Sequence, residues 1–297
     1  MADINLKGLG VALITPFKED GSVDYETLTK LVDYQLQSGT DYLVVLGTTA
    51  ETPTLTEEEK DRIVEQVVAQ VHGRIPLVLG LGGNCTRVIV DKLHTGCFEG
   101  INAILSVVPY YNKPSQEGIY QHYKAISAAT SLPVVLYNVP GRTGVNMTAA
   151  TTLRIARDCP NVIAVKEASG NISQMDDIIK NKPANFNVIS GDDGIAFPLI
   201  TLGAIGVISV IGNAFPREFG RMIRLALAGD YESARSIHHR FTELFSLLFV
   251  DGNPAGVKSM LHAMGYIENK LRLPLVPTRL TTFEQIRQVL QQLHIRC

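Results

Sequence analysis

Several patterns that define common protein classes are missing from this chain. No apolar run reaches the roughly 18–20 residues that a membrane-spanning helix needs. The first seven residues lack the apolar stretch of a signal peptide. The 27 basic and 29 acidic residues nearly balance, so no surplus of charge points to a nucleic acid or a membrane surface. We therefore expect a cytoplasmic globular protein that binds neither.

The cysteines and histidines also lack the spacing of a metal site or a disulfide framework. Cys85, Cys97, Cys159 and Cys297 form no Cys-x-x-Cys pair, so we expect them to be reduced thiols. None of the 7 histidines forms a His-x-x-x-His pair, which argues against a catalytic zinc site. These patterns predict a protein that works without a metal or another cofactor.

Short runs rich in β-branched residues alternate with amphipathic, helix-like stretches along most of the chain. Such runs are typical of buried strands, and the stretches between them are long enough for helices. The predicted strands are residues 10–15, 42–47, 76–80, 102–107, 133–138, 162–166, 187–191 and 206–210. Helices are predicted in segments that include residues 25–38, 57–72, 116–130 and 216–228.

This alternation predicts an α/β fold, because parallel strands need helical crossover connections. Eight units are the number that closes a (β/α)8 TIM barrel. A doubly wound open sheet is the main alternative, but it favours a glycine-rich loop after the first strand, and Gly8 to Gly10 precede the predicted one. We predict a catalytic barrel over residues 1–230 and a small helical C-terminal appendage over residues 231–297.

Local signals mark where several helices begin. Thr56 and Glu59 have the spacing of a capping box, and Ser115 can cap the helix that follows Pro114. Asp192 and Asp193 are adjacent acids, which could hold a metal ion. We favour helix N-terminal caps, because acids are common there.

Lys166 is the most informative single residue, because it ends the apolar run that begins at residue 162. One interpretation is a lysine that extends from the strand edge to solvent. The other is a buried lysine, whose ammonium is costly unless it is paired and which becomes a nucleophile for carbonyl groups once it loses its proton. The polar strand ends elsewhere in the chain favour the second interpretation.

Polar side chains and glycines follow nearly every predicted strand. Because catalytic groups of barrel enzymes lie at the carboxyl ends of the strands, they predict a pocket with a lysine in its floor. Each has a simpler interpretation: Thr48 and Thr49 could bond a local turn, Tyr137 could be a core aromatic, and Arg142 could be a solvated cation. The functional interpretation is that the threonines cradle a carboxylate and that Arg142 binds another through its guanidinium.

Five motifs together resemble the dihydrodipicolinate synthase family of the pyruvate-dependent class I aldolases. The resemblance extends along essentially the whole chain, including Asn253-Pro254 and Val257-Lys258. Arg142 is its most specific mark, since sialic acid lyases of similar fold generally lack that arginine. Ala50 departs from the commoner glycine, and we expect its methyl group to be tolerated. The motifs are Gly47-Thr48-Thr49-x-Glu51, Pro109-Tyr110-Tyr111, Tyr137-Asn138-Val139-Pro140-x-Arg142-Thr143-Gly144, Val165-Lys166-Glu167-Ala168-x-Gly170 and Ser190-Gly191-Asp192-Asp193.

The resemblance implies a reaction and a role for each residue. Pyruvate forms a Schiff base with Lys166 and then condenses with aspartate 4-semialdehyde to give 4-hydroxy-tetrahydrodipicolinate, in the diaminopimelate route to lysine. The implied site residues are Lys166 for the imine, Tyr137, Thr49 and Tyr111 for proton transfer, Thr48 and Thr49 for the pyruvate carboxylate, Arg142 for the carboxylate of the second substrate, and Gly191 and Ile208 for backbone carbonyl groups.

The resemblance also implies an assembly and a regulatory property. Family members are homotetramers made of two dimers, and Tyr111 reaches the neighbouring subunit. Lysine-sensitive members bind lysine at the dimer interface, with a histidine and a glutamate at the positions of Lys60 and Val88. We therefore expect weak or absent inhibition by lysine here, unless Glu57 supplies the missing carboxylate.

Two other functions fit parts of this pattern. A lyase for sialic acid or a 2-keto-3-deoxy sugar acid would use the same lysine, but a polyol substrate does not need the cation of Arg142. A non-catalytic barrel that binds keto acids in a regulatory role would tolerate a broken proton relay, whereas Tyr111, Thr49 and Tyr137 are all present. The sequence favours the condensing enzyme.

Overall fold

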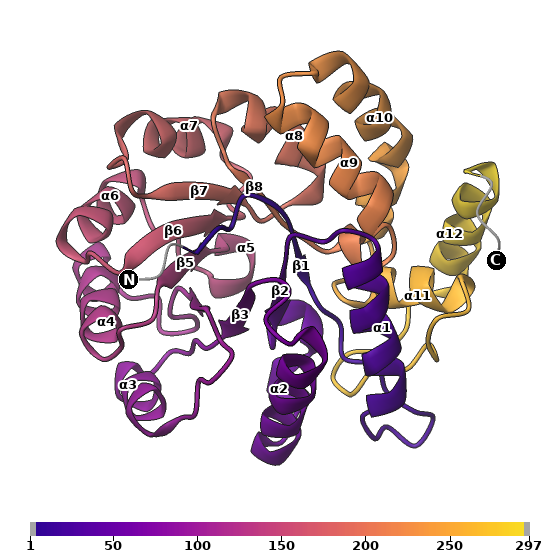
Figure 1. Cartoon of the computed structure of the whole chain (residues 1–297), viewed down its shortest axis with the longest axis horizontal. Helices are drawn as coiled ribbons and strands as arrows, with labels where there is room; N and C mark the ends of the chain where they lie inside the picture. Colours follow the sequence, from indigo (N-terminus) through magenta and orange to yellow (C-terminus); the bar gives the residue numbers. More distant parts are fainter. Residues whose placement is uncertain (1–3, 294–297) are drawn as a thin grey trace.

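The computed structural model describes residues 4–293 as one closed barrel of parallel strands surrounded by helices (Figure 1). The strands pair in the order of the sequence, and β1 closes the barrel by pairing with β8. This confirms the predicted (β/α)8 barrel and excludes the open doubly wound sheet. The strands are β1 (Gly8–Ala12), β2 (Tyr42–Val45), β3 (Leu77–Gly80), β4 (Ala103–Val107), β5 (Val134–Asn138), β6 (Val162–Glu167), β7 (Asn187–Ser190) and β8 (Gly206–Ser209).

Helices follow the strands and cover the outside of the barrel (Figure 1). The helices are α1 (Tyr25–Gln37), α2 (Glu57–Val71), α3 (Thr86–Thr95), α4 (Gln116–Ala128), α5 (Pro140–Thr143), α6 (Ala149–Asp158), α7 (Ile172–Asn181), α8 (Asp193–Leu202), α9 (Pro216–Leu227), α10 (Tyr231–Leu247), α11 (Ala255–Ala263) and α12 (Leu280–Gln292). Three short 3-10 helices lie in loops: η1 (Thr48–Ala50), η2 (Thr52–Thr54) and η3 (Ile211–Asn213).

The first strand begins earlier than predicted, at Gly8 rather than residue 10. Gly8 and Gly10 therefore lie within β1, and the prediction that these glycines precede the strand was wrong. A Cβ atom at Gly10 would lie 2.2 Å from ring atoms of Tyr42, which is fully buried inside the barrel. Glycine is a poor strand former in isolation, so only the packing of this ring reveals why it is used here.

The predicted helix starts are confirmed at two positions. The Thr56 hydroxyl accepts a hydrogen bond from the Glu59 N–H while the Glu59 carboxylate accepts one from the Thr56 N–H. Ser115 caps α4 by accepting a hydrogen bond from the N–H of Gly118. These contacts satisfy helix N–H groups that have no partner within the helix.

The aspartate pair before α8 divides into one cap and one buried acid. Asp192 caps the helix by accepting a hydrogen bond from the Gly194 N–H, as predicted. Asp193 does not act as a cap: one of its oxygens accepts hydrogen bonds from the N–H groups of Val210 and Ile211 at 2.9 and 2.8 Å. Its other oxygen has no hydrogen-bond partner in the part of the chain that the structure describes. The second acid thus ties the ends of β7 and β8 together.

Alternate strand residues face the inside of the barrel, as the pleat of a strand requires. Tyr137, Ala164 and Ile208 belong to the inner apolar cluster, whereas Leu136 and Val165 pack toward the helices. This alternation places Lys166, two residues after Ala164, on the inner side of β6.

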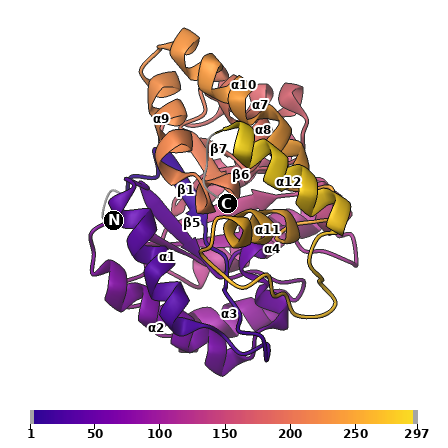
Figure 2. The ribbon, with the colours of Figure 1, turned by 90° about the vertical axis from the view of Figure 1, so that its right-hand side faces the viewer.

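The C-terminal helices lie against one side of the barrel (Figure 2). α10 packs on α8 and α9, α12 contacts α10 and α11, and α11 contacts η3. The boundary at residues 230 and 231 stays a prediction. Within residues 4–293, no helix combines the length and the hydropathy needed to cross a bilayer. Cys85, Cys97 and Cys159 form no disulfide with one another, and Cys297 lies outside the described residues.

Candidate active site

Lys166 is buried inside the barrel rather than extended into solvent, with 5% of its surface exposed. It pairs in register with Tyr137 of the neighbouring strand, and its Nζ lies 4.2 Å from the centre of the Tyr137 ring. Among residues 4–293, no carboxylate lies within ion-pairing distance of this Nζ. A buried amine beside a tyrosine and without a carboxylate is suited to attack on a carbonyl carbon.

Gly191 lies directly beside the lysine side chain. A Cβ atom at this position would be 3.1 Å from Cε of Lys166 and 2.7 Å from the Cβ of Ala168. The N–H of Gly191 donates to the carbonyl oxygen of Glu167 at 2.7 Å, which holds the two strand ends together. Ile208, on β8, is buried in the same inner cluster as Tyr137. The structure therefore brings Lys166, Tyr137 and Gly191 into one place.

Thr48 and Thr49 form the 3-10 turn η1 at the end of β2. Thr49 is buried and Thr48 is half-buried. The hydroxyl of Thr15 donates to the carbonyl of Ala50 at 2.8 Å, and that of Thr52 donates to the carbonyl of Gly47 at the same distance. These bonds anchor the turn at both of its ends, and the methyl group of Ala50 is buried within it.

A buried polar network supports the lysine strand from the helix side. Glu167 is fully buried, and its carboxylate accepts hydrogen bonds from Ser169 at 2.5 Å and from Asn138. Burial raises the pKa of this carboxyl, and the hydrogen bonds from Ser169 and Asn138 oppose the rise. Asn138 also binds the Met147 N–H, so the network links β5, β6 and the loop after α5. Asn138 and Glu167 are 29 positions apart in the sequence. Apart from the acid after Lys166, nothing in the sequence indicated this network.

Arg142 and Tyr111 lie on neighbouring loops, and both are exposed. Arg142 belongs to the short helix α5 after β5. Tyr111 has 84% of its surface exposed and a positive φ of 74°, and its N–H donates to the Thr143 carbonyl at 3.4 Å. The single chain therefore brings the Tyr111 backbone to the β5 loop but leaves its side chain in solvent.

The segment between α10 and α11 contacts the turn η1, which carries Thr49. Asn253 is 6% exposed, and its Nδ2 donates a hydrogen bond to Oγ1 of Thr49 at 3.1 Å. Sequence reasoning noted Asn253 only as part of a matching motif. Nothing in the sequence indicates this contact, because the two residues are 204 positions apart.

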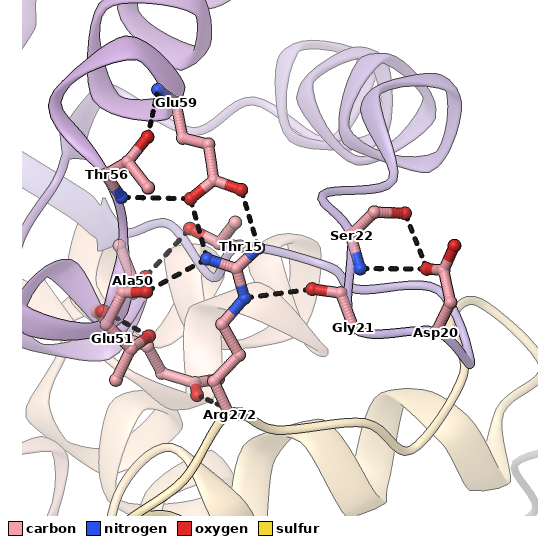
Figure 3. A network of polar contacts seen from close by, with 10 residues as sticks. Thr15, Asp20, Gly21, Ser22, Ala50, Glu51, Thr56, Glu59 and Arg272 are labelled. Carbon is pink, nitrogen blue, oxygen red and sulfur yellow. Dashed lines mark hydrogen bonds and ion pairs between the residues drawn. The ribbon is translucent and has the colours of Figure 1, made fainter.

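Two ion pairs tie residues near the C-terminal end of the chain to Glu51, which follows η1, and to Glu59 of α2. Figure 3 shows the pair of Arg272 with Glu59. Lys258 Nζ lies 2.5 Å from an oxygen of Glu51, and both side chains are fully buried. The Arg272 N–H donates to the other Glu51 oxygen at 3.0 Å, and the Arg272 guanidinium binds Glu59 through two bonds of 2.6 Å. The C-terminal segment thus completes the β2 side of the mouth.

A separate cavity of about 930 Å³ lies outside the barrel, between α2, the end of β3 and α3. Glu57 stands at its edge, with carboxylate oxygens 2.8 Å from both Lys60 Nζ and Lys92 Nζ. Hydrogen bonds from Lys60 and Lys92 lower the pKa of Glu57 to about 2. This carboxylate is therefore already shared between two cations.

A model of the dihydrodipicolinate synthetase family matches residues 5–293, nearly the whole chain. The chain belongs to this family. It is 82% identical to a 4-hydroxy-tetrahydrodipicolinate synthase of Parabacteroides distasonis over 100% of both chains. A solved dihydrodipicolinate synthase of Thermotoga maritima is 43% identical, with a TM-score of 0.95 and coverage of 97% of this chain and 99% of its own.

A second solved relative carries a substrate. It is a chloride-inhibited dihydrodipicolinate synthase of Acinetobacter baumannii complexed with pyruvate, 40% identical to this chain. The match covers 98% of this chain and 100% of that one, with a TM-score of 0.95. The predicted membership of the class I aldolases with this fold is therefore confirmed.

Proposed function

We propose that the chain condenses pyruvate with aspartate 4-semialdehyde through a Schiff base on Lys166. The product is 4-hydroxy-tetrahydrodipicolinate, made in the diaminopimelate route to lysine. The observation that carries the proposal is a buried Lys166 amine, free of carboxylates and flanked by Tyr137 and Gly191, in a chain 82% identical to a synthase of that name.

The lysine amine attacks the keto carbon of pyruvate, and loss of water gives the imine. The protonated imine accepts electrons from the methyl group, which loses a proton and becomes an enamine. The enamine carbon then attacks the aldehyde of the second substrate and forms the new carbon–carbon bond. Finally the amino group of that substrate displaces the lysine, which closes the ring and frees Lys166.

The residues at the mouth divide these tasks. Tyr137, Thr49 and Tyr111 transfer protons, which requires hydroxyl groups within hydrogen-bond reach of one another and of the substrate. Thr48 and Thr49 bind the pyruvate carboxylate, and the backbone carbonyl groups of Gly191 and Ile208 face the substrate. The exposed Arg142 binds the carboxylate of the aldehyde substrate, since a guanidinium matches a carboxylate through two parallel hydrogen bonds.

The assembly that we infer is a homotetramer built from two dimers, in the cytoplasm. Its support is Tyr111, because 84% of the surface of this residue is exposed in the single chain. We infer that its side chain enters the site of a second copy. The substrates are the two small keto and aldehyde acids.

Borohydride reduction with pyruvate tests the proposal, because it converts the imine into a stable adduct. Peptide mass mapping should find the added mass on Lys166 alone, and Lys166→Ala should not be labelled. Lys258 is an internal control, since it is also buried but is paired with Glu51. A label on Lys92, Lys113 or Lys258 in place of Lys166 would overturn the assignment.

The role of Arg142 is tested separately from imine formation. Arg142→Ala should still form the pyruvate adduct, because the chemistry of imine formation does not require the charge of Arg142. Condensation should fall by about 10²-fold or more, as removal of a charged hydrogen-bonding partner costs several kcal/mol. Unchanged kinetics with the aldehyde would rule out this role, and a gain of condensation with N-acetylmannosamine would favour a sugar-acid lyase.

A further inference from the structure

The contact between Asn253 and Thr49 joins the C-terminal segment to the proton relay. Asn253 is more than nine-tenths buried, and its Nδ2 donates to Oγ1 of Thr49 at 3.1 Å. Its Oδ1 is also buried and has no hydrogen-bond partner among residues 4–293. Thr49 itself is 2% exposed. Within residues 4–293, this amide therefore forms one hydrogen bond, to a hydroxyl that the proposed function assigns to proton transfer.

The direction of this hydrogen bond limits what the Thr49 hydroxyl can do. A hydroxyl has one hydrogen to donate and two lone pairs to accept with. The Asn253 N–H occupies one of the lone pairs, so the Thr49 hydrogen must point to another group. A neutral amide nitrogen does not take that hydrogen, and the hydroxyl is left free to donate it toward the inside of the barrel.

We propose that Asn253 is a positioning residue that orients the Thr49 hydroxyl for proton transfer. The proposal rests on the function proposed above, because it needs Thr49 to act on the pyruvate imine. Asn253 touches neither substrate nor Lys166 in this role, and it acts through Thr49 alone.

A neighbouring buried ion pair, between Glu51 and Lys258, fixes the positions of Thr49 and Asn253 relative to each other. Glu51 is two residues after Thr49, and Lys258 is five residues after Asn253. Their bond of 2.5 Å is fully buried, so the turn that carries Thr49 and the segment that carries Asn253 cannot slide apart without separating two buried charges. Such support from a surrounding shell is what a precisely oriented catalytic hydroxyl needs.

A buried amide with one unpaired end is unfavourable for the fold itself. An unsatisfied buried polar atom destabilises the folded state, and native proteins contain few of them. An apolar side chain at position 253 would avoid this cost, so stability alone does not account for the amide. The use of its N–H by Thr49 does.

A double-mutant cycle in the intact enzyme tests the proposal through the proton step. The variants are Asn253→Ala, Thr49→Val and the double variant, and the readout is deuterium exchange into the pyruvate methyl group in D2O without the aldehyde. Asn253→Ala should slow exchange by about tenfold or more, since oriented acid–base groups contribute about 10²–10⁴-fold. In the Thr49→Val background, the same change should alter the rate by less than about twofold.

Asn253→Asp gives a second readout that a purely structural role would not produce. An ionised carboxylate only accepts hydrogen bonds, so it would draw the Thr49 hydrogen away from the barrel interior. Exchange in this variant should be slow at high pH and should recover as the carboxyl is protonated at low pH. Rates of the native enzyme and of Asn253→Asp that share one pH profile would contradict the proposal.

Asn269→Ala is the matched control. This asparagine lies between α11 and α12 and donates to Ser259 at 3.4 Å. Among residues 4–293 its buried oxygen also lacks a partner, and its amide donates to Ser259 rather than to Thr49. Its removal should leave exchange unchanged. A loss in Asn269→Ala equal to that in Asn253→Ala would show a general packing effect instead.

Borohydride labelling and deuterium exchange together distinguish failure of the Asn253 proposal from failure of the proposed function. Borohydride labelling of Lys166 by pyruvate should persist in all the Asn253 variants. No label in the native enzyme overturns the proposed function. A labelled native enzyme whose exchange is unaffected by Asn253→Ala, or is slowed equally with Thr49→Val present, overturns the positioning role. If Asn253→Ala does not fold, the pH profile of Asn253→Asp decides.

Discussion

Two loops at the same end of the barrel differ in how the chain completes them. The turn after β2 carries Thr49 and is tied to the C-terminal segment by Asn253 and by the buried pair of Glu51 and Lys258. The loop after β4 carries Tyr111, whose side chain is 84% exposed. The first loop is held by contacts within the chain, whereas the second carries an aromatic side chain that is mostly exposed.

The comparison shows which of the two loops is fixed by contacts within the single chain. Buried ion pairs define one geometry, because neither charge can leave its partner without a large desolvation cost. An exposed tyrosine has no such restraint until another surface covers it. The first loop is therefore held in place by contacts of the single chain, and we predict that a second copy covers the other loop.

The largest expected effect is on activity, in variants of Tyr111 on the exposed loop after β4. Mixing of variant subunits tests whether this loop acts in the site of a second copy. Tyr111→Phe should lower activity by about 10²–10⁴-fold, the usual contribution of an acid–base group. Lys166→Ala should be inactive. Mixed dimers would contain one complete site made from both chains, so random exchange should restore about a quarter of native activity.

The mixing experiment needs proof of exchange. Differently tagged subunits of the two variants should co-purify in one assembly. Verified exchange without any recovery would place Tyr111 in the site of its own chain, and the contrast between the two loops would no longer concern assembly.

Breaking the anchored side should mainly affect stability. Lys258→Met leaves Glu51 buried without its cation, which should lower the free energy of unfolding by about 3–5 kcal/mol. Adding Glu51→Gln should recover most of the loss, because the remaining side chains are neutral. Urea unfolding of the single and double variants measures both changes.

An exposed pair serves as the control for that experiment. Lys30 and Glu26 lie 2.7 Å apart with 69% and 80% of their side chains exposed. Lys30→Met should leave the urea midpoint essentially unchanged, because solvent screens an exposed ion pair. Equal effects at Lys258 and Lys30 would show that burial of the pair is unimportant.

Asp193, at the start of α8, is a buried acid for which the structure shows no ion pair among residues 4–293, and we expect it to make stability depend on pH. Burial raises its pKa from 3.8 to about 6, against hydrogen bonds from the Ile211 and Val210 N–H groups. A raised folded pKa stabilises the fold below the unfolded value, and this contribution is lost as pH rises through about 6. Native protein should therefore gain about 1–1.5 kcal/mol relative to Asp193→Asn between about pH 8 and about pH 5.

Urea unfolding of both proteins at the two pH values measures this change. Because each protein is compared with the other at the same pH, the remaining titrating groups cancel. A difference that does not depend on pH would mean that Asp193 stays ionised throughout.

The smallest expected effect is inhibition by lysine, which we predict to be weak or absent. Val88 supplies no carboxylate, and Glu57 is already bound to Lys60 and Lys92 at 2.8 Å. An incoming lysine would compete with two cations for one carboxylate. Steady-state titration with lysine checks this, and inhibition in the sub-millimolar range would show that Glu57 compensates. The double variant Lys60→His with Val88→Glu should gain sensitivity.

Periodicity alone was enough to predict most of the fold. Apart from the first, each predicted strand begins and ends within two residues of the observed one. The exception was β1, which starts two residues and ends three residues earlier than predicted. The prediction left Gly8 outside the strand. The use of Gly10 in the strand depends on the Tyr42 ring that occupies the space of the missing Cβ, and that ring comes from another strand.

The sequence by itself determined the barrel, the position of Lys166 on an inner strand face and the polar residues at the strand ends. These follow from local patterns, because the alternation of side chains and the spacing of helices are repeated within a few residues. It also contained the motifs from which membership of the family was predicted.

Only the tertiary structure decided which distant residues complete the site. The contacts of Asn253 with Thr49 and of Lys258 with Glu51 span 204 and 207 positions, and the Glu167 network joins β5, β6 and the loop after α5. A hydrogen bond or an ion pair depends on distances of a few ångströms between atoms. Closure of the barrel and packing of the C-terminal helices set those distances, and no periodic pattern along the chain encodes them.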